Sequence, residues 1–92
     1  MQQGRFLLAD IYHGTGEINF HVDDKEGMIR RLAGVFADGE IDDLDGITVQ
    51  YADWWFNVRP SNTEPLLRLN LEAKTQAEME QRRDELLKIL RQ

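Results

Sequence analysis

The sequence predicts an α+β fold, a mostly antiparallel sheet of about four strands with two helices packed on one face. Alternating apolar and polar residues, typical of half-buried strands, occur at 17–22 and at intervals between 47 and 73. Apolar residues at helical spacing occupy two longer stretches, 23–39 and 75–92. The resulting order of strand, helix, several strands and helix predicts a two-layer sandwich.

The composition limits the classes of function. Ninety-two residues make one small domain. The formal net charge of −6 disfavours binding to nucleic acid or to an anionic membrane, because both need a basic footprint. The absence of cysteine excludes disulfides and thiol chemistry and fits a cytoplasmic location. The longest apolar runs have three or four residues, so neither a transmembrane helix nor a signal peptide is expected.

The first half of the chain is expected to contain one strand and one long helix. FLLADIY at 6–12 predicts a short helical segment, and HGTG at 13–16 a linker or turn. At the start of the helix, Asp23 and Glu26 resemble a capping box, and Gly39 is expected to end it in a left-handed conformation. An apolar stripe faces the sheet: Met28, Ile29, Leu32, Ala33 and Phe36.

The second half is expected to contain the remaining strands and the last helix. EIDDLDG, residues 40–46, predicts a short edge strand or a turn. The strands that follow are expected at 47–51, 54–59 and 65–73, with a tight turn at 52–53. In the last helix, Thr75 is the expected N-cap and Glu78 completes a Thr-x-x-Glu box.

The hairpin around 61–64 raises a question of charge. Strand alternation puts Phe56, Val58 and the leucines of 65–73 on the core side of the sheet. It puts Arg59 and Arg68 on the other side, roughly opposite each other, and like charges across a sheet are destabilising. We therefore expect a neutralising group, either a carboxylate such as Glu64 or Glu72 or a bound anion.

The residues of the turn favour the anion. Ser61 and Thr63 offer hydroxyl donors and Asn62 an amide. Asparagine tolerates the left-handed conformation, so successive backbone N–H groups could form a nest for phosphate. Arginine matches phosphate oxygens with bidentate hydrogen bonds. Residue types alone leave open a polar hairpin whose two surface arginines pair with glutamates.

The segment RPSNTEPLLRLNLEA resembles the C-terminal phosphate-binding loop of the α-D-phosphohexomutases, the phosphomannomutase/phosphoglucomutase enzymes. The family pattern Arg-x-Ser-Asn/Gly-Thr-Glu-Pro, followed by Arg and a downstream Glu, is matched in order. The matching residues are Arg59, Ser61, Asn62, Thr63, Glu64, Pro65, Arg68 and Glu72. GEINF at 16–20 and LDG at 44–46 also resemble the family, so the resemblance covers roughly residues 12–92.

This resemblance implies a domain that works inside a larger enzyme. The family's enzymes have four domains, with a phosphoserine in the first, Mg2+ in the second and a sugar-selecting loop in the third. They interconvert hexose 6-phosphate and hexose 1-phosphate through a bisphosphate intermediate. The last domain resembles the TATA-box-binding-protein fold, used without DNA, and its loop grips the substrate phosphate. The implied partners are a phosphosugar and the preceding domains, with no nucleic acid and no membrane.

The resemblance also implies roles for single residues. Arg59, Ser61, Asn62 and Thr63 are expected to contact the substrate phosphate. Arg68 is expected either to support that charge or to form a structural pair with a glutamate. Glu64 is expected to brace the loop. Asn62 favours the phosphomannomutase/phosphoglucomutase branch over the phosphoglucosamine mutases, which usually have glycine there.

The sequence lacks the family's other motifs. It contains no Ser-His phosphoserine loop, no Asp-x-Asp-x-Asp metal motif and no sugar loop, and DDLD at 42–45 is interpreted as a solvated edge. We therefore expect 13–92 to be the C-terminal phosphate-binding domain and 1–12 a remnant of the preceding domain or a linker. The chain alone is expected to be inactive, and Mg2+ to bind in another domain.

Three alternatives complete the set of hypotheses. His13 and His21 could bind a metal, but they lie eight positions apart and no organised carboxylate partner is evident. Trp54 or Trp55 could stack on a sugar, although packing or burial in a domain interface explains them better. The whole domain could instead be a stand-alone module for protein interaction or a structural domain.

Overall fold

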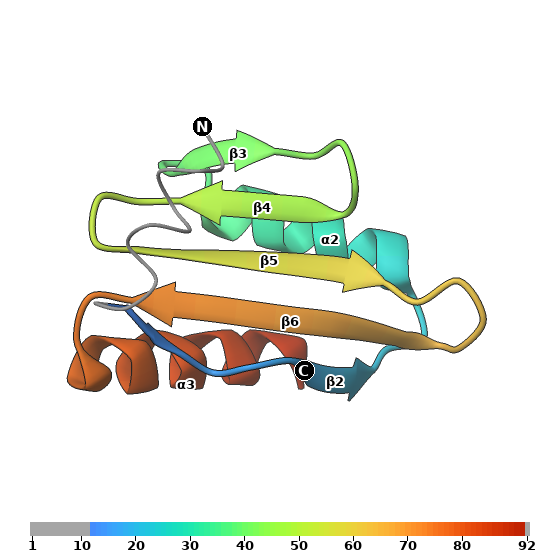
Figure 1. Cartoon of the computed structure of the whole chain (residues 1–92). Helices are drawn as coiled ribbons and strands as arrows, with labels where there is room; N and C mark the ends of the chain where they lie inside the picture. The colour runs from blue at the N-terminus through green and yellow to red at the C-terminus, as the bar shows by residue number, and fades with distance from the viewer. Residues whose placement is uncertain (1–11, 92) are drawn as a thin grey trace.

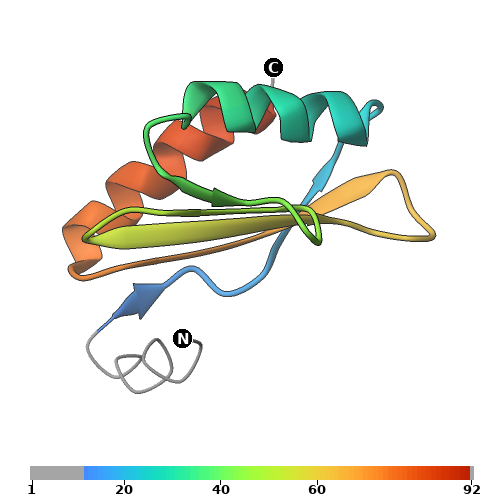
Figure 2. The ribbon, with the colours of Figure 1, turned by 90° about the horizontal axis from the view of Figure 1, so that it is seen from above.

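The computed structural model describes residues 12–91, in which an antiparallel six-stranded sheet is covered on one face by two helices. Figures 1 and 2 show α2 and α3 on the same side of the sheet, and no helix of residues 12–91 lies on the opposite face. The predicted α+β sandwich is therefore confirmed. The helical segment expected at 6–12 falls outside the described residues, except for Tyr12, which is in no helix or strand.

The sheet is larger than the sequence predicted. Its strands are β1 (His13–Gly14), β2 (Ile18–His21), β3 (Glu40–Asp42), β4 (Ile47–Gln50), β5 (Trp54–Pro60) and β6 (Leu66–Ala73). Both β1 and β2 pair with β6, and β5, β4 and β3 follow on its other side. The expected number of about four was too low because β3 is a strand and because HGTG does not form only a turn.

Residues 13–21 follow β6 along most of one edge, which explains the extra strand. β1 pairs with the last two residues of β6 and β2 with the first four. Between them, the Thr15 N–H donates to the Leu71 carbonyl at 3.0 Å, and the Leu71 N–H donates to Thr15 Oγ1 at 3.3 Å. A side-chain oxygen thus replaces a backbone partner, so the edge stays hydrogen-bonded where the chain leaves the sheet.

The first helix, α2 (Lys25–Val35), differs from the prediction at both ends. Its N-cap is Asp24, one residue later than expected, and Asp24 Oδ1 accepts from the Gly27 N–H at 2.9 Å. It ends at Val35 with Phe36 as the C-cap, and Gly39 does not have the expected left-handed conformation. Gly39 serves close packing instead: a Cβ there would lie 2.6 Å from Val49 Cγ1.

The second helix, α3 (Gln76–Leu90), begins as expected. Thr75 is the N-cap, and its Oγ1 accepts from the Glu78 N–H at 3.1 Å. The Glu78 carboxylate lies 3.5 Å from Arg82 Nε, one turn further along the helix. No helix in residues 12–91 is long and apolar enough to cross a membrane.

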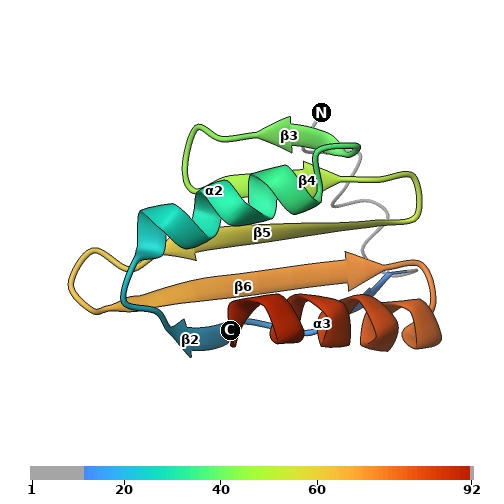
Figure 3. The same ribbon diagram turned by 180° about the vertical axis from the view of Figure 1, so that it is seen from behind.

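The core lies between the sheet and the two helices, which Figure 3 shows from the helix side. β5 and β6 supply its centre through Phe56, Val58 and the leucines at 67, 69 and 71, all almost fully buried. Leu32 of α2 and Leu86 of α3 cover them and are fully buried. The alternation predicted for the hairpin is confirmed, and the opposite side chains of β5 and β6 face away from the core.

Aromatic side chains pack together at the end of the sandwich where β4 turns into β5. Tyr51 stacks on Trp54 with ring centres 4.8 Å apart, and Phe36 meets Trp54 edge-on at 5.9 Å. The Arg82 guanidinium lies 4.8 Å from the centre of the Trp54 ring. Since Trp54 is 3% exposed, it is a core residue and not a platform for a sugar.

Tyr51 makes the stability of this end depend on pH. Burial, reinforced by its hydrogen bond to Asp38 at 2.7 Å and by the charge of Asp38, raises the pKa of Tyr51 to about 12. The unfolded chain loses this proton near the ordinary value of 10.0, so the stabilisation is complete below that pH and is lost as the pH rises toward 12. We expect the urea midpoint of the protein to fall between about pH 9 and 11.5 more steeply than that of Tyr51→Phe. Parallel curves would contradict the assignment.

Candidate functional site

Strands β5 and β6 bring Arg59 and Arg68 together. The two are direct partners in the register of the hairpin, as the sequence predicted. Asn57 and Asn70 form the next pair on the same face, which the helices leave uncovered. Both are interior strands of the sheet, because β4 lies on the other side of β5, and β1 and β2 lie on the other side of β6. At this end the β5–β6 loop, residues 61–65, projects beyond the sheet (Figure 1).

A hollow of about 380 Å³, here called the arginine pocket, lies between these arginines and the loop. All five predicted site residues line it: Arg59, Ser61, Asn62, Thr63 and Arg68. Its other walls come from Glu17, Asn57, Pro60 and Asn70. The structure thus assembles in one place the donors that the sequence suggested for binding an anion.

Each arginine has an acidic neighbour, but not one of those expected. Arg68 Nη1 donates to Glu17 Oε2 at 2.9 Å, and Arg59 Nε lies 3.9 Å from Asp45 Oδ2. Glu72 instead accepts from the Trp55 indole N–H at 3.2 Å. The expectation that Glu64 or Glu72 neutralises the pair is therefore wrong in the described residues.

These ion pairs are exposed and can open. The side chains of Arg59 and Asp45 are 57% and 82% exposed, and their contact is long. Those of Arg68 and Glu17 are 39% and 48% exposed. Exposed pairs contribute about 0–1 kcal/mol, which is less than a well-placed bond between arginine and a dianion. The Arg68–Glu17 contact gives Arg68 a glutamate partner, one of the two roles considered for it.

The loop does not form the expected left-handed nest. No non-glycine residue in 12–91 has a positive φ, so Asn62 is not left-handed. The N–H groups of Thr63 and Glu64 instead point to Ser61 Oγ, at 3.4 and 3.3 Å. Ser61 is 6% exposed and organises the loop from inside, while its hydroxyl proton stays available as a donor.

The tip of the loop keeps its polar groups available. Asn62 and Thr63 are exposed, and their side chains make no hydrogen bond to any other residue of the described chain. The backbone N–H of Asn62 likewise has no partner among residues 12–91. Ser61, Asn62 and Thr63 all line the arginine pocket, which therefore combines two arginines with several neutral polar residues.

Gly46 holds a second loop against the pocket. It has a φ of 76°, and a Cβ at this position would overlap the Val58 carbonyl oxygen and lie 2.9 Å from Arg59 Cα. Only glycine fits such an approach without strain. Gly46 thereby keeps Asp45 beside Arg59. The LDG segment was noticed in the sequence, but nothing in its letters showed which strand it would touch.

A family comparison decides the identity of this arrangement. The profile described as phosphoglucomutase/phosphomannomutase, C-terminal domain, matches residues 17–89. The chain belongs to this family. The match contains both strands of the hairpin, the loop and Glu17, so every residue lining the pocket lies in the C-terminal domain of the phosphoglucomutase/phosphomannomutase family.

Individual members of the family are similar to this chain over most of its length. A phosphomannomutase of Methanocaldococcus jannaschii is 43% identical over 79 residues, which cover 86% of this chain and 18% of that protein. A Xanthomonas campestris protein described as phosphohexose mutases is 45% identical, covering 98% of this chain and 22% of that protein. The chain spans about a fifth of the length of these relatives.

A solved structure confirms the fold of this mutase domain. The crystal structure of a phosphoglucomutase/phosphomannomutase family protein from Burkholderia thailandensis superposes with a TM-score of 0.67 and 28% sequence identity. The superposition covers 92% of this chain and 19% of the other. The fold of this chain is thus shared with a solved member of the family.

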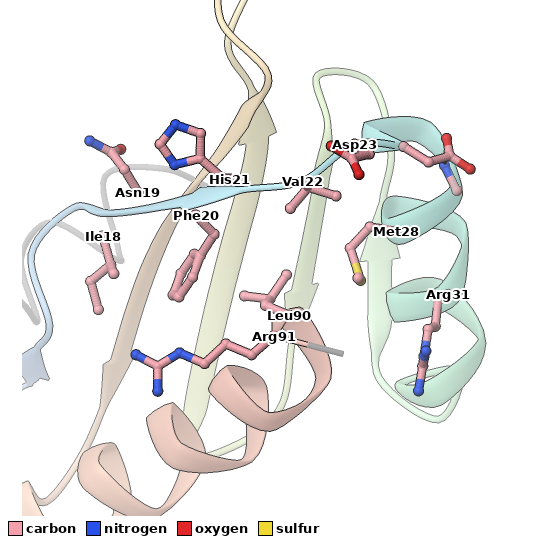
Figure 4. Close-up of a pocket in the computed structure, with 12 residues that line it drawn as sticks. Ile18, Asn19, Phe20, His21, Val22, Asp23, Met28, Arg31, Leu90 and Arg91 are labelled. Atoms are coloured by element: carbon pink, nitrogen blue, oxygen red, sulfur yellow. Dashed lines mark hydrogen bonds between the residues drawn. The ribbon is translucent and has the colours of Figure 1, made fainter.

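The mutase domain has a second hollow of about 860 Å³ on its helix side (Figure 4). Phe20 of β2, Met28 of α2 and Leu90 of α3 face into it, whereas His21 points away from it. His13 is exposed on β1. No three His, Cys, Asp or Glu side chains of residues 12–91 gather as metal ligands, so the histidine hypothesis has no structural support in that range.

Proposed function

We propose that this chain is the substrate-phosphate-binding domain of a phosphomannomutase/phosphoglucomutase. The enzyme would interconvert hexose 6-phosphate and hexose 1-phosphate through a bisphosphate intermediate. The proposal rests on one observation: the arginine pocket unites Arg59 and Arg68 with the hydrogen-bond donors of the β5–β6 loop. Its location in the C-terminal domain of this family supports the assignment.

The donor set suits a phosphate dianion. Each guanidinium can give two parallel N–H bonds to phosphate oxygens. The hydroxyl groups of Ser61 and Thr63 and the amide of Asn62 supply neutral donors for the remaining lone pairs. At roughly 1.5–3 kcal/mol per well-placed charge-assisted bond, such a site offsets the cost of separating Arg68 from Glu17. Affinity for the isolated domain is expected near the millimolar range, about −4 kcal/mol.

In this proposal the domain binds and the rest of the enzyme reacts. Residues 12–91 offer no set of ligands fit for Mg2+, so no step is assigned to a metal in this domain. The phosphoserine and the Mg2+ site would belong to other domains of the parent protein. The contribution of this chain is to orient the substrate through its non-reacting phosphate, which lets binding energy serve catalysis.

A titration tests the proposal. Amide resonances of residues 59, 61–63 and 68 are followed by NMR while inorganic phosphate or hexose 1-phosphate is added. Both ligands are expected to shift these resonances at millimolar concentration, and the unphosphorylated hexose is expected to leave them unchanged. Shifts confined to another surface, or none at all, would refute phosphate binding and favour a protein-interaction module.

A further inference from the structure

Lys25, the first residue of α2, reaches the back of the β5–β6 loop. Its ammonium donates to the Ser61 carbonyl at 2.7 Å and to the Glu64 carbonyl at 3.0 Å. The chain beside it is also tied to the loop, because the Val22 N–H donates to the Pro65 carbonyl at 3.0 Å. In Figures 1 and 3 the start of α2 lies at the same end of the sheet as the loop.

The choice of partners distinguishes Lys25 from an ordinary surface lysine. Asp23, Asp24 and Glu26 are its neighbours in sequence, yet Lys25 forms no ion pair with any carboxylate of residues 12–91. Its proton donors go to two backbone carbonyls at the two ends of one turn instead. The contact is specific, because the lysine is partly buried and its ammonium donates two charge-assisted hydrogen bonds.

These bonds determine which way the loop faces. The ammonium of Lys25 holds the carbonyls of Ser61 and Glu64 on the side of the loop where Lys25 lies. Lys25 itself does not line the arginine pocket. Inside the turn, Ser61 Oγ holds the N–H groups of Thr63 and Glu64. With carbonyls held behind and two N–H groups held within, the N–H of Asn62 and the polar side chains of the tip are left for the pocket.

We propose that Lys25 is a positioning residue for phosphate binding: it holds the β5–β6 loop in its binding shape without touching the ligand. This inference rests on the proposed function. It explains a lysine at the start of a helix, where the macrodipole disfavours a positive charge. The energy that the dipole costs is offset by two bonds that keep loop carbonyls, which would repel a phosphate, away from the pocket.

The test replaces Lys25 by methionine, which keeps the stem and removes the ammonium. Lys74→Met is the matched control. It removes the same charge, but from an exposed ion pair with Asp53 at the other end of the hairpin. Lys25→Met is expected to weaken phosphate binding about tenfold and to speed hydrogen exchange at the amides of 63, 64 and 66. Lys74→Met is expected to change neither by more than about twofold.

The outcomes separate this inference from the proposed function. If the unmodified chain does not bind phosphate, both fail. If it binds but Lys25→Met resembles Lys74→Met in affinity and in loop exchange, only the positioning role is refuted. Should the methionine variant fail to fold, Lys25→Gln retains an amide donor and is expected to bind with an intermediate affinity. Lys25→Gln binding as tightly as the unmodified chain would also overturn the role.

Discussion

Arg59→Ala is expected to weaken binding of hexose 1-phosphate about 10- to 100-fold. Arg59 lines the arginine pocket beside the loop, and its contact with Asp45 is long and exposed, so its donors are available to a ligand. Alanine removes a bidentate partner of the dianion but nothing from the core, because the side chain is 57% exposed. The fold is therefore expected to persist. The affinity is measured by titration of the loop amides, and the fold by the unfolding midpoint.

Glu17→Gln is a complementary variant, which is expected to strengthen phosphate binding and not to weaken it. It removes the carboxylate that accepts from Arg68 at 2.9 Å, so the guanidinium no longer has to leave an ionic partner when phosphate arrives. We expect phosphate to bind a few times more tightly, with the largest gain at low salt. An Arg59→Ala chain that binds as well as the unmodified one would exclude this pocket as the phosphate site. A Glu17→Gln chain with weakened binding would show that Glu17 orients Arg68.

Gly46→Ala is expected to lower the free energy of unfolding by about 2–4 kcal/mol. The φ of 76° is unfavourable for alanine, and the new methyl group would collide with the Val58 carbonyl oxygen and press on Arg59 Cα. Part of the response is expected at the site, since the collision moves the strand that presents Arg59. Urea unfolding measures the first effect, and the amide resonances of residues 58 and 59 report the second.

Two other glycines separate strain from collision. Gly16 has a φ of 70° with no atom within 4 Å of a Cβ, so Gly16→Ala is expected to lose only the conformational term, about 1–2 kcal/mol. Gly34 lies in α2 with equally open surroundings, and Gly34→Ala is expected to gain about 0.5–1 kcal/mol. Equal losses for Gly46→Ala and Gly16→Ala would contradict the close approach described here.

Local patterns were sufficient to predict the hairpin. Alternation from residue 54 onward determines which side chains are buried, and a short loop leaves little freedom in register, so the pairing of Arg59 with Arg68 follows. The role of Thr75 as the N-cap of α3 was equally predictable, because its capping hydrogen bond joins residues only three positions apart. At α2 the capping-box pattern of Asp23 with Glu26 favoured the wrong one of two adjacent aspartates, because the N-cap is Asp24.

Contacts between distant residues could not be predicted. Lys25 and Ser61 are 36 residues apart, and Arg68 and Glu17 are 51 apart, so their meeting depends on how the whole chain folds. β1 was missed because two residues of HGTG have no alternation to detect and gain strand geometry only from β6. The predicted left-handed conformation of Asn62 was wrong. The Ser61 hydroxyl oxygen accepts from the N–H groups of Thr63 and Glu64, which a nest would have left without a partner.

The acidic neighbours of the two arginines affect how a ligand reaches them. At separations of about one Debye length, ~8 Å at physiological ionic strength, the net charge of −6 still repels an approaching dianion, and beyond that distance salt screens the repulsion. Attraction prevails only at close range, where the guanidinium groups of Arg59 and Arg68 act directly. For the proposed phosphate site, this balance favours a ligand that another surface already holds close to the arginine pocket over one that diffuses in from dilute solution.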